Sequence, residues 1–221
     1  MKKMKKSDWG LLLFILSTFV TGIILYPNLP EKLPTHWNLA GQVDTYTDKL
    51  YAIFLLPGIN LLLFFLFIFL PKIDPRKKNY QRFAGAYRIF RWAMHILLGI
   101  TYLLTLYYSL NKPENIPFYL EVSFIVPVMV SILFIILGNY MGKIKDNFFI
   151  GIRTPWTLSS KEVWYKTHRL AGKLYVVSGI LGIIGSFFED IITFIMLLGP
   201  VIVFNIYLVV YSYFEYKKEQ E

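Results

Sequence analysis

Residues 51–70 read YAIFLLPGINLLLFFLFIFL and contain no charged side chain. A helix of about 20 such residues crosses the ~30 Å hydrocarbon core of a bilayer. Five more apolar runs follow the same pattern, at residues 9–26, 89–110, 118–137, 171–188 and 191–214. This pattern predicts an all-α integral membrane protein, built as a bundle of six transmembrane helices.

The composition agrees with a protein that is largely in contact with lipid. Apolar residues make up 56% of the chain and charged residues only 17%, which is too little polar surface to coat a soluble globule. The formal net charge of +9 suggests either nucleic-acid binding or the retention of basic loops on the cytoplasmic side of a membrane. The absence of cysteine excludes disulfides and thiolate metal sites.

The distribution of the basic residues decides between these two explanations of the charge. If the six runs span the membrane, 20 of the 23 lysines and arginines lie on the side that holds both termini. Only Lys32, Lys49 and Lys112 lie on the other side. Because basic residues near span ends are retained in the cytoplasm, we expect both termini to be cytoplasmic and the protein to reside in a bacterial cell membrane, with no direct contact to nucleic acid.

Three segments organise the chain on this topology. Residues 1–70 form an N-terminal two-helix unit with a structured outer loop at residues 27–50, and the first run is an uncleaved anchor. Residues 71–137 hold the third and fourth spans. Residues 138–221 hold a long cytoplasmic loop and a C-terminal two-helix hairpin.

The outer loop is too patterned to be a simple connector. Its three prolines favour an extended entry, and Asn38 and Gly41 supply turn chemistry before Asp44. One interpretation is that His36, Trp37 and Asp44 offer a stacking ring and a hydrogen-bonding pair to a ligand. The other is that Trp37 is an interfacial anchor, while His36 and Asp44 only hold the turn. A metal site is not predicted, because this side has a single histidine.

The cytoplasmic loop contains a second patterned region. Ser159 and Glu162 form a capping-box pattern, which predicts a helix that begins there and continues into the fifth span. Trp164 and His168 would share one face of this helix, among basic residues, which is typical of an interfacial helix lying at the headgroups. Before it, Arg153 follows a short apolar stretch, where its guanidinium suits a lipid phosphate, an internal acid or a protein partner.

Taken together, the two loops resemble the SdpI family of membrane immunity proteins against sporulation-delaying-type peptide toxins. The outer segment at residues 33–44, LPTHWNLAGQVD, is similar to the membrane domain of unknown function at the N-terminus of these proteins. The cytoplasmic loop is similar to the second signature of the family. The similar residues are Gly138-Asn139, residues 149–158 (FIGIRTPWTL), Trp164, His168 and Arg169.

The resemblance implies a protein that protects its own cell membrane from a secreted peptide toxin. The resemblance also implies a second role, found in some members of the family: a receptor that holds a cytoplasmic transcriptional repressor at the membrane when toxin is bound. Expected partners are therefore the toxin, a repressor and membrane lipids, with no cofactor and no metal. The candidate toxin-binding residues are Pro34, His36, Trp37, Asn38, Gly41, Asp44 and Lys49. The candidate cytoplasmic residues are Asn139, Gly151, Arg153, Thr154, Pro155, Trp156, Thr157, Trp164, His168 and Arg169.

A membrane-embedded enzyme is one alternative to the immunity function. Such an enzyme needs a nucleophile or activated water with its base on one side of the membrane. The expected topology separates the histidines, with His36 outside, His95 in the third span and His168 inside. Asp146 or Glu162 is near enough in sequence to pair with His168, but the local pattern matches no hydrolase motif. No enzymatic activity is predicted.

A small-solute transporter is the other alternative, because polar residues inside spans are often functional. The candidates are Asn60, His95, Glu121 and Asn205. The sequence shows no inverted repeat, and asparagines commonly form hydrogen bonds between helices. A structural role is therefore the stronger expectation for each.

Overall fold

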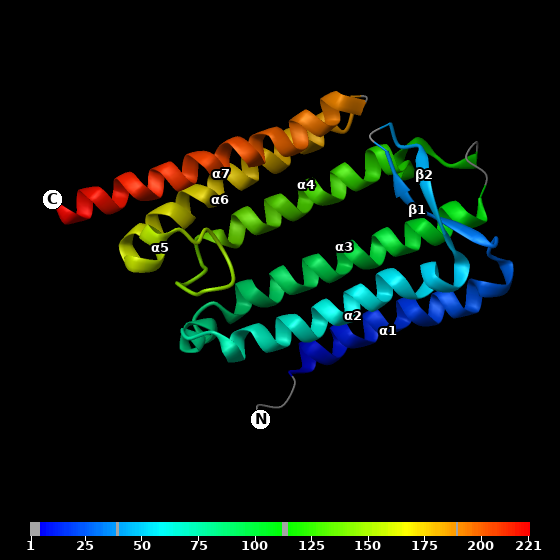
Figure 1. The fold of residues 1–221 in the computed structure, drawn as a ribbon, viewed down its shortest axis with the longest axis horizontal. Helices are drawn as coiled ribbons and strands as arrows, with labels where there is room; N and C mark the ends of the chain where they lie inside the picture. Colours follow the sequence, from blue (N-terminus) through cyan, green and yellow to red (C-terminus); the bar gives the residue numbers. More distant parts are fainter. Residues whose placement is uncertain (1–4, 39, 112–114, 189) are drawn as a thin grey trace. The chain divides into compact units, whose positions relative to one another are not determined.

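The computed structural model describes residues 5–38, 40–111, 115–188 and 190–221, and within them the chain is mostly helical with one β-hairpin (Figure 1). The elements are α1 (Lys6–Leu25), η1 (Tyr26–Asn28), β1 (Lys32–Trp37), β2 (Val43–Asp48), α2 (Lys49–Ile73), η2 (Lys77–Gln81), α3 (Ala84–Leu110), η4 (Phe118–Leu120), α4 (Val122–Met141), α5 (Pro155–Ser159), α6 (Lys161–Gly185) and α7 (Asp190–Gln220). Parts of the sequence predictions rest on Lys2, Lys3, Leu39, Lys112 and Glu189, which lie outside the described residues.

Five segments are long and apolar enough to cross a membrane by length and composition: Lys6–Asn28, Lys49–Ile73, Ala84–Leu110, Val122–Met141 and Ile191–Gln220. They coincide with five of the six predicted runs, so a helical membrane protein is confirmed at this level. The remaining run lies in α6, which is not among these five segments. The run at residues 171–188 carries a lysine and four glycines, which lower its apolar character.

The chain forms two compact units, each described by itself. The first contains the described parts of residues 1–67 and 92–126, and the second those of 68–91 and 127–221. A buried cluster of the first unit joins the base of the hairpin to α2 and α3, through Leu29, Leu33, Ala52, Ile53, Tyr102 and Leu106. The Tyr102 hydroxyl donates a hydrogen bond to the Ile53 carbonyl at 3.1 Å, so this phenol is both buried and satisfied.

The predicted outer loop is structured, and its structure is a β-hairpin. Strands β1 and β2 pair antiparallel, with Lys32 opposite Asp48, Leu33 opposite Thr47 and Pro34 opposite Tyr46, and the register is irregular beyond Pro34. A structured outer loop was predicted, but its two strands were not. The β-branched and aromatic residues of VDTYT in β2 are the sequence signal that favours them.

In the second unit, α6 packs closely on two neighbours. It lies beside α7 in Figure 1. Toward α4, a Cβ added to Gly138 would lie 2.6 Å from the Gly172 carbonyl oxygen, and one added to Gly179 would lie 2.5 Å from the Ser131 carbonyl oxygen. Only glycine permits so close an approach. The same glycines that weaken the apolar signal of α6 therefore form its packing surface.

The predicted start of the helix that contains Trp164 is wrong by one residue. Ser160, not Ser159, is the N-cap of α6, and its hydroxyl accepts the backbone N–H groups of Glu162 and Val163 at 3.2 Å each. Ser159 ends the short helix α5 instead, where its hydroxyl donates to the Pro155 carbonyl at 2.7 Å. From its N-cap, α6 continues without a break to Gly185.

Candidate functional site

A histidine–carboxylate pair links the two strands of the hairpin. The His36 Nδ1 atom lies 2.6 Å from Asp44 Oδ1, and both side chains are exposed. The hydrogen bond from His36 lowers the pKa of the Asp44 carboxyl below its ordinary value. The structure therefore brings together two of the predicted outer residues and keeps them accessible.

The turn of the hairpin is held by Asn38. Its backbone N–H donates to the Gln42 carbonyl at 2.9 Å, and its side-chain oxygen accepts the Gln42 N–H at 3.0 Å. Gly41, with a φ of 72°, donates its N–H to the Asn38 carbonyl at 3.0 Å. The predicted turn chemistry of Asn38 and Gly41 is thus confirmed.

The other predicted outer residues fasten the hairpin to its unit. Trp37 is half-buried and packs edge-on against Tyr108 of α3, with ring centroids 5.8 Å apart. Pro34 is buried in β1, and the Lys49 ammonium forms an ion pair with Glu31 at 2.9 Å. These contacts give Trp37 and Lys49 structural roles. The His36–Asp44 pair and Asn38 are the polar members of this set that stay exposed.

Residues 142–160, here called the signature loop, are organised around the buried side chain of Asn147. Its amide nitrogen donates to the carbonyls of Lys145 and Ile150, at 2.9 and 3.0 Å. Its oxygen accepts the N–H groups of Phe149 and Ile150, at 2.9 and 2.7 Å. One fully buried side chain therefore satisfies four backbone groups of residues 145–150, which form neither a helix nor a strand.

The segment after α2 completes this network. The buried Asp74 carboxylate accepts the Phe148 N–H at 2.9 Å and the Tyr80 hydroxyl at 3.2 Å. Burial, reinforced by Asp74, raises the pKa of Tyr80 above its ordinary value, so the phenol stays protonated and donates. Arg76 forms an ion pair with Asp146 at 3.1 Å and donates to the Leu158 carbonyl at 2.7 Å.

Sequence reasoning missed Asn147, Asp74, Arg76 and Tyr80 as residues that shape this loop. A local signal existed for two of them, because Asp146-Asn147 and Asp74-Pro75 are turn-forming pairs. The partnership between the two segments, some 70 residues apart in the chain, is visible only in the tertiary structure.

His168 is fully buried in α6 and is held by two backbone groups. Its Nε2 accepts the Ile152 N–H at 3.0 Å, and its Nδ1 faces the Trp164 carbonyl at 2.8 Å. Since an amide can only donate and a carbonyl can only accept, these contacts require the neutral ring with the proton on Nδ1. Burial lowers the pKa of His168 to about 4, in agreement with that form.

The carboxylates considered as partners of His168 do not pair with it. Asp146 pairs with Arg76, and Glu162 pairs with Lys166 at 3.3 Å. The His168 ring instead stacks on Trp164, with centroids 4.0 Å apart, so the predicted shared face of these two residues is confirmed. Both rings are buried in protein, and the Trp164 indole donates to the Ile144 carbonyl at 2.8 Å.

The centre of the family-like motif builds the start of α5. Thr154 is the N-cap, and its hydroxyl accepts the Thr157 N–H at 3.2 Å and contacts the Ser212 hydroxyl of α7 at 3.0 Å. Pro155 occupies the first turn, where its missing N–H costs nothing. Trp156 packs against Tyr213 of α7 with ring centroids 5.1 Å apart. These residues therefore attach the signature loop to α7.

Four of the predicted cytoplasmic residues are exposed: Pro155 at the start of α5 and the polar residues Asn139, Arg153 and Arg169. Arg153 donates to the Phe148 carbonyl at 2.8 Å, and Arg169 contacts the Tyr165 hydroxyl at 3.4 Å. Asn139 of α4 donates to the Ile135 carbonyl of its own helix, at 2.9 Å. The buried members of the set shape the loop, whereas these exposed members are free to meet a ligand or partner.

The polar residues considered for transport mostly bond between helices. Asn60 of α2 donates to the His95 carbonyl at 3.2 Å, and its oxygen contacts the His95 ring. Tyr175 of α6 donates to the Asn205 oxygen of α7 at 3.2 Å. Glu121 instead follows η4 at the start of α4. Across the described ranges, no three histidines, cysteines or acids gather as a metal site would require.

Apolar helices joined by two structured loops define an α-helical membrane protein. Residues 143–212 match the SdpI/YfhL protein family, and residues 13–61 match the domain of unknown function DUF1648. The Immunity protein SdpI of Bacillus subtilis (strain 168) is 33% identical over 215 residues, which cover 97% of this chain and 98% of that protein. The chain therefore belongs to the SdpI family, as its two loops predicted. No solved structure matches it.

Proposed function

We propose that this protein is a membrane immunity protein that protects its cell from a secreted antimicrobial peptide toxin. The observation that carries the proposal is the 33% identity to an immunity protein over nearly the whole of both chains. The order of the two matched regions adds support, because DUF1648 covers the hairpin and the SdpI region covers the signature loop. A transporter or an enzyme has no comparable support.

The proposed topology has six spans with both termini in the cytoplasm. Five apolar helices and the asymmetry of the basic residues support it, with the second half of α6 as the remaining span. In this topology the first turns of α6, residues 161–170, lie at the cytoplasmic headgroups. The hairpin then faces the outside, and the signature loop faces the cytoplasm.

The hairpin is the proposed toxin-binding site. The His36–Asp44 pair is exposed and offers an imidazole nitrogen and a carboxylate oxygen to a peptide backbone. In the adjacent residue Trp37, the indole Nε1 is buried without a hydrogen-bond partner in the described part of the chain. A donor in this state would gain a hydrogen bond if a peptide carbonyl reached it.

The signature loop is the proposed cytoplasmic reporter of toxin binding. Its buried network fixes the backbone, so the exposed Arg153 is presented in a defined place to an acidic surface of a repressor. Coupling between the two sites requires two arrangements of the protein with different affinities for toxin.

Survival of a sensitive bacterial host tests the immunity proposal. Cells with and without the protein are challenged with a panel of sporulation-delaying-type peptide toxins, at confirmed membrane abundance. Protection against a member is expected to fall in Asp44→Asn and to persist in Asp48→Asn, which changes an exposed carboxylate of the same strand. If wild-type cells die at the same toxin doses as cells without the protein, the proposal is refuted.

The sensing proposal has a separate readout. Protected cells are expected to change their transcripts when toxin is added, and Arg153→Gln is expected to abolish the change while protection remains. Arg82→Gln, an exposed arginine between α2 and α3, is the matched control. Equal transcript responses in wild type and Arg153→Gln would refute a reporting role for this side chain.

A further inference from the structure

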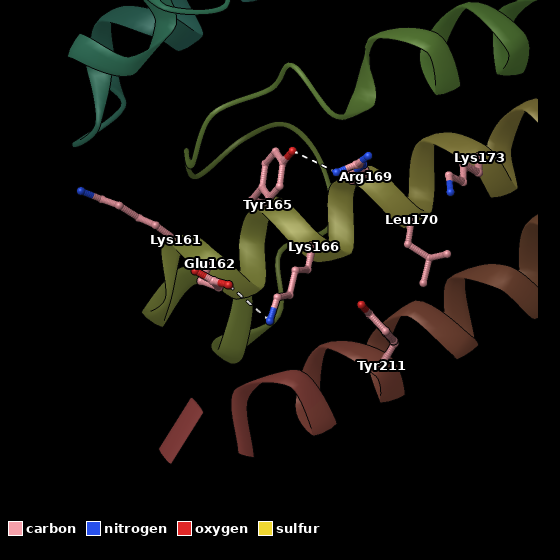
Figure 2. Close-up of a pocket in the computed structure, with 8 residues that line it drawn as sticks. All are labelled: Lys161, Glu162, Tyr165, Lys166, Arg169, Leu170, Lys173 and Tyr211. Atoms are coloured by element: carbon pink, nitrogen blue, oxygen red, sulfur yellow. Dashed lines mark hydrogen bonds and ion pairs between the residues drawn. The ribbon is translucent and has the colours of Figure 1, made fainter. Parts of the chain in front are cut away.

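A groove of about 690 Å³ runs along α6 and is closed on one side by Tyr211 of α7 (Figure 2). Its remaining lining comes from α6 alone. Lys161, Tyr165, Arg169 and Lys173 follow one another at four-residue intervals, and Glu162, Lys166 and Leu170 form the adjacent row. Four cationic side chains and one carboxylate therefore line a single concave surface.

Most of this positive charge is not neutralised by the residues that the structure describes. Lys166 is the exception, because it lies between Glu162 at 3.3 Å and Glu215 at 3.1 Å, and these partners raise its pKa. Among the described residues, the Tyr165 hydroxyl is the one polar side-chain contact of Arg169. Lys161 and Lys173 form no ion pair with any described residue. The groove thus keeps three cations for an external anion.

We propose that this groove binds the phosphate headgroup of an anionic phospholipid. The guanidinium of Arg169 suits two oxygens of one phosphate, and the neighbouring lysines add charge without fixed geometry. Leu170 and Tyr211 supply an apolar wall, which favours a phosphate that carries acyl chains over free phosphate. The rings of Tyr165 and Tyr211 are of the kind that gathers at membrane interfaces.

The place of the groove in the chain agrees with this ligand. Lys173 is the third residue of the apolar run that begins at residue 171, so the groove extends from the loop into the expected span. In the topology proposed above, on which this inference rests, that level is the cytoplasmic leaflet. Anionic lipids concentrate there, and basic pockets between helices on that side bind their headgroups.

Native mass spectrometry of the full-length protein in detergent tests the proposal. The protein is mixed with equal amounts of phosphatidylglycerol and phosphatidylcholine, and the retained lipid is counted. We expect selective retention of phosphatidylglycerol. The double variant Arg169→Gln/Lys173→Gln is expected to retain it about 25-fold less well, because each lost cation weakens headgroup binding roughly fivefold.

The control is Lys77→Gln/Lys78→Gln, which removes two exposed cations outside the groove. It should retain phosphatidylglycerol as wild type does. Arg169→Lys keeps the charge and loses the planar fork, so its retention should fall between those of wild type and the double variant. The proposal can still be tested if the double variant folds poorly, because Arg169→Lys preserves the charge of the groove.

Three results would overturn the proposal. The first is equal retention of the two lipids by the wild-type protein. The second is equal loss of phosphatidylglycerol in the groove and control double variants. The third is displacement of the lipid by inorganic phosphate at equimolar concentration, which would make free phosphate the ligand. The measurement uses no toxin, so a failure of the immunity proposal leaves its outcome unaffected.

Discussion

Substituting Gly151 by alanine should unfold the signature loop locally, for two reasons that the structure supplies. Gly151 has a φ of 103°, where a side chain costs about 1–2 kcal/mol. Its added Cβ would also lie 2.3 Å from His168 Nε2, the atom that accepts the Ile152 N–H. The ring is stacked on Trp164 and cannot retreat freely, so this hydrogen bond is lost at a further cost of about 1 kcal/mol.

Gly151→Ala should therefore lower the free energy of unfolding by about 2–3 kcal/mol. The assay is equilibrium unfolding of the purified protein in mixed micelles, followed by tryptophan fluorescence. Gly142→Ala is the matched control in the same loop, because the nearest neighbour of its Cβ would be Arg169 Cα at 3.7 Å, an ordinary contact. Equal unfolding midpoints for the two variants would refute the reasoning from Gly151 and His168.

Three other substitutions, at His168, Asn147 and Gly179, test buried groups of the second unit. Because the pKa of His168 is lowered to about 4 from an ordinary 6.5, stability should be complete above pH 6.5 and fall as the pH drops from 6.5 toward 4. His168→Gln should flatten this dependence, and an unchanged pH profile would contradict it. Asn147→Ala should lower the unfolding free energy by about 2–4 kcal/mol in the same assay, against less than ~0.5 kcal/mol for the exposed Asn139→Ala; similar losses would refute the central role of Asn147. Gly179→Leu should abolish folded protein in size-exclusion chromatography, whereas Gly58→Leu, with no neighbour within 4 Å of its Cβ, should fold; a folded Gly179→Leu would argue against close packing of α4 and α6.

The membrane class of the protein and its family were readable from the sequence. Apolar runs identify five of the helices, because a segment that crosses the hydrocarbon core needs about 20 predominantly apolar residues. The run in α6 is different. Its glycines serve contact with α4 and weaken the apolar signal, so the sixth span remains a prediction from the sequence.

Local chemistry was predictable where the interaction partners are near in sequence. The turn at Asn38 and Gly41 and the shared face of Trp164 and His168 depend on residues a few positions apart. The N-cap was misplaced by one position because two adjacent serines carry the same signal, and only the hydrogen bonds to Ser160 decide between them.

The class, the apolar helices and the family follow from composition, periodicity and short motifs, so they could be predicted without the structure. Tertiary structure alone decided the bonding of the signature loop. The Asp74 carboxylate accepts the Phe148 N–H, and the Tyr80 hydroxyl donates to Asn147 Oδ1. Such partners, about 70 residues apart in the chain, leave no periodic trace in the sequence. The tertiary structure also decided that His168 is a neutral, buried support for Gly151 and Ile152 rather than the partner of a carboxylate. Burial and backbone contacts set the protonation of this ring.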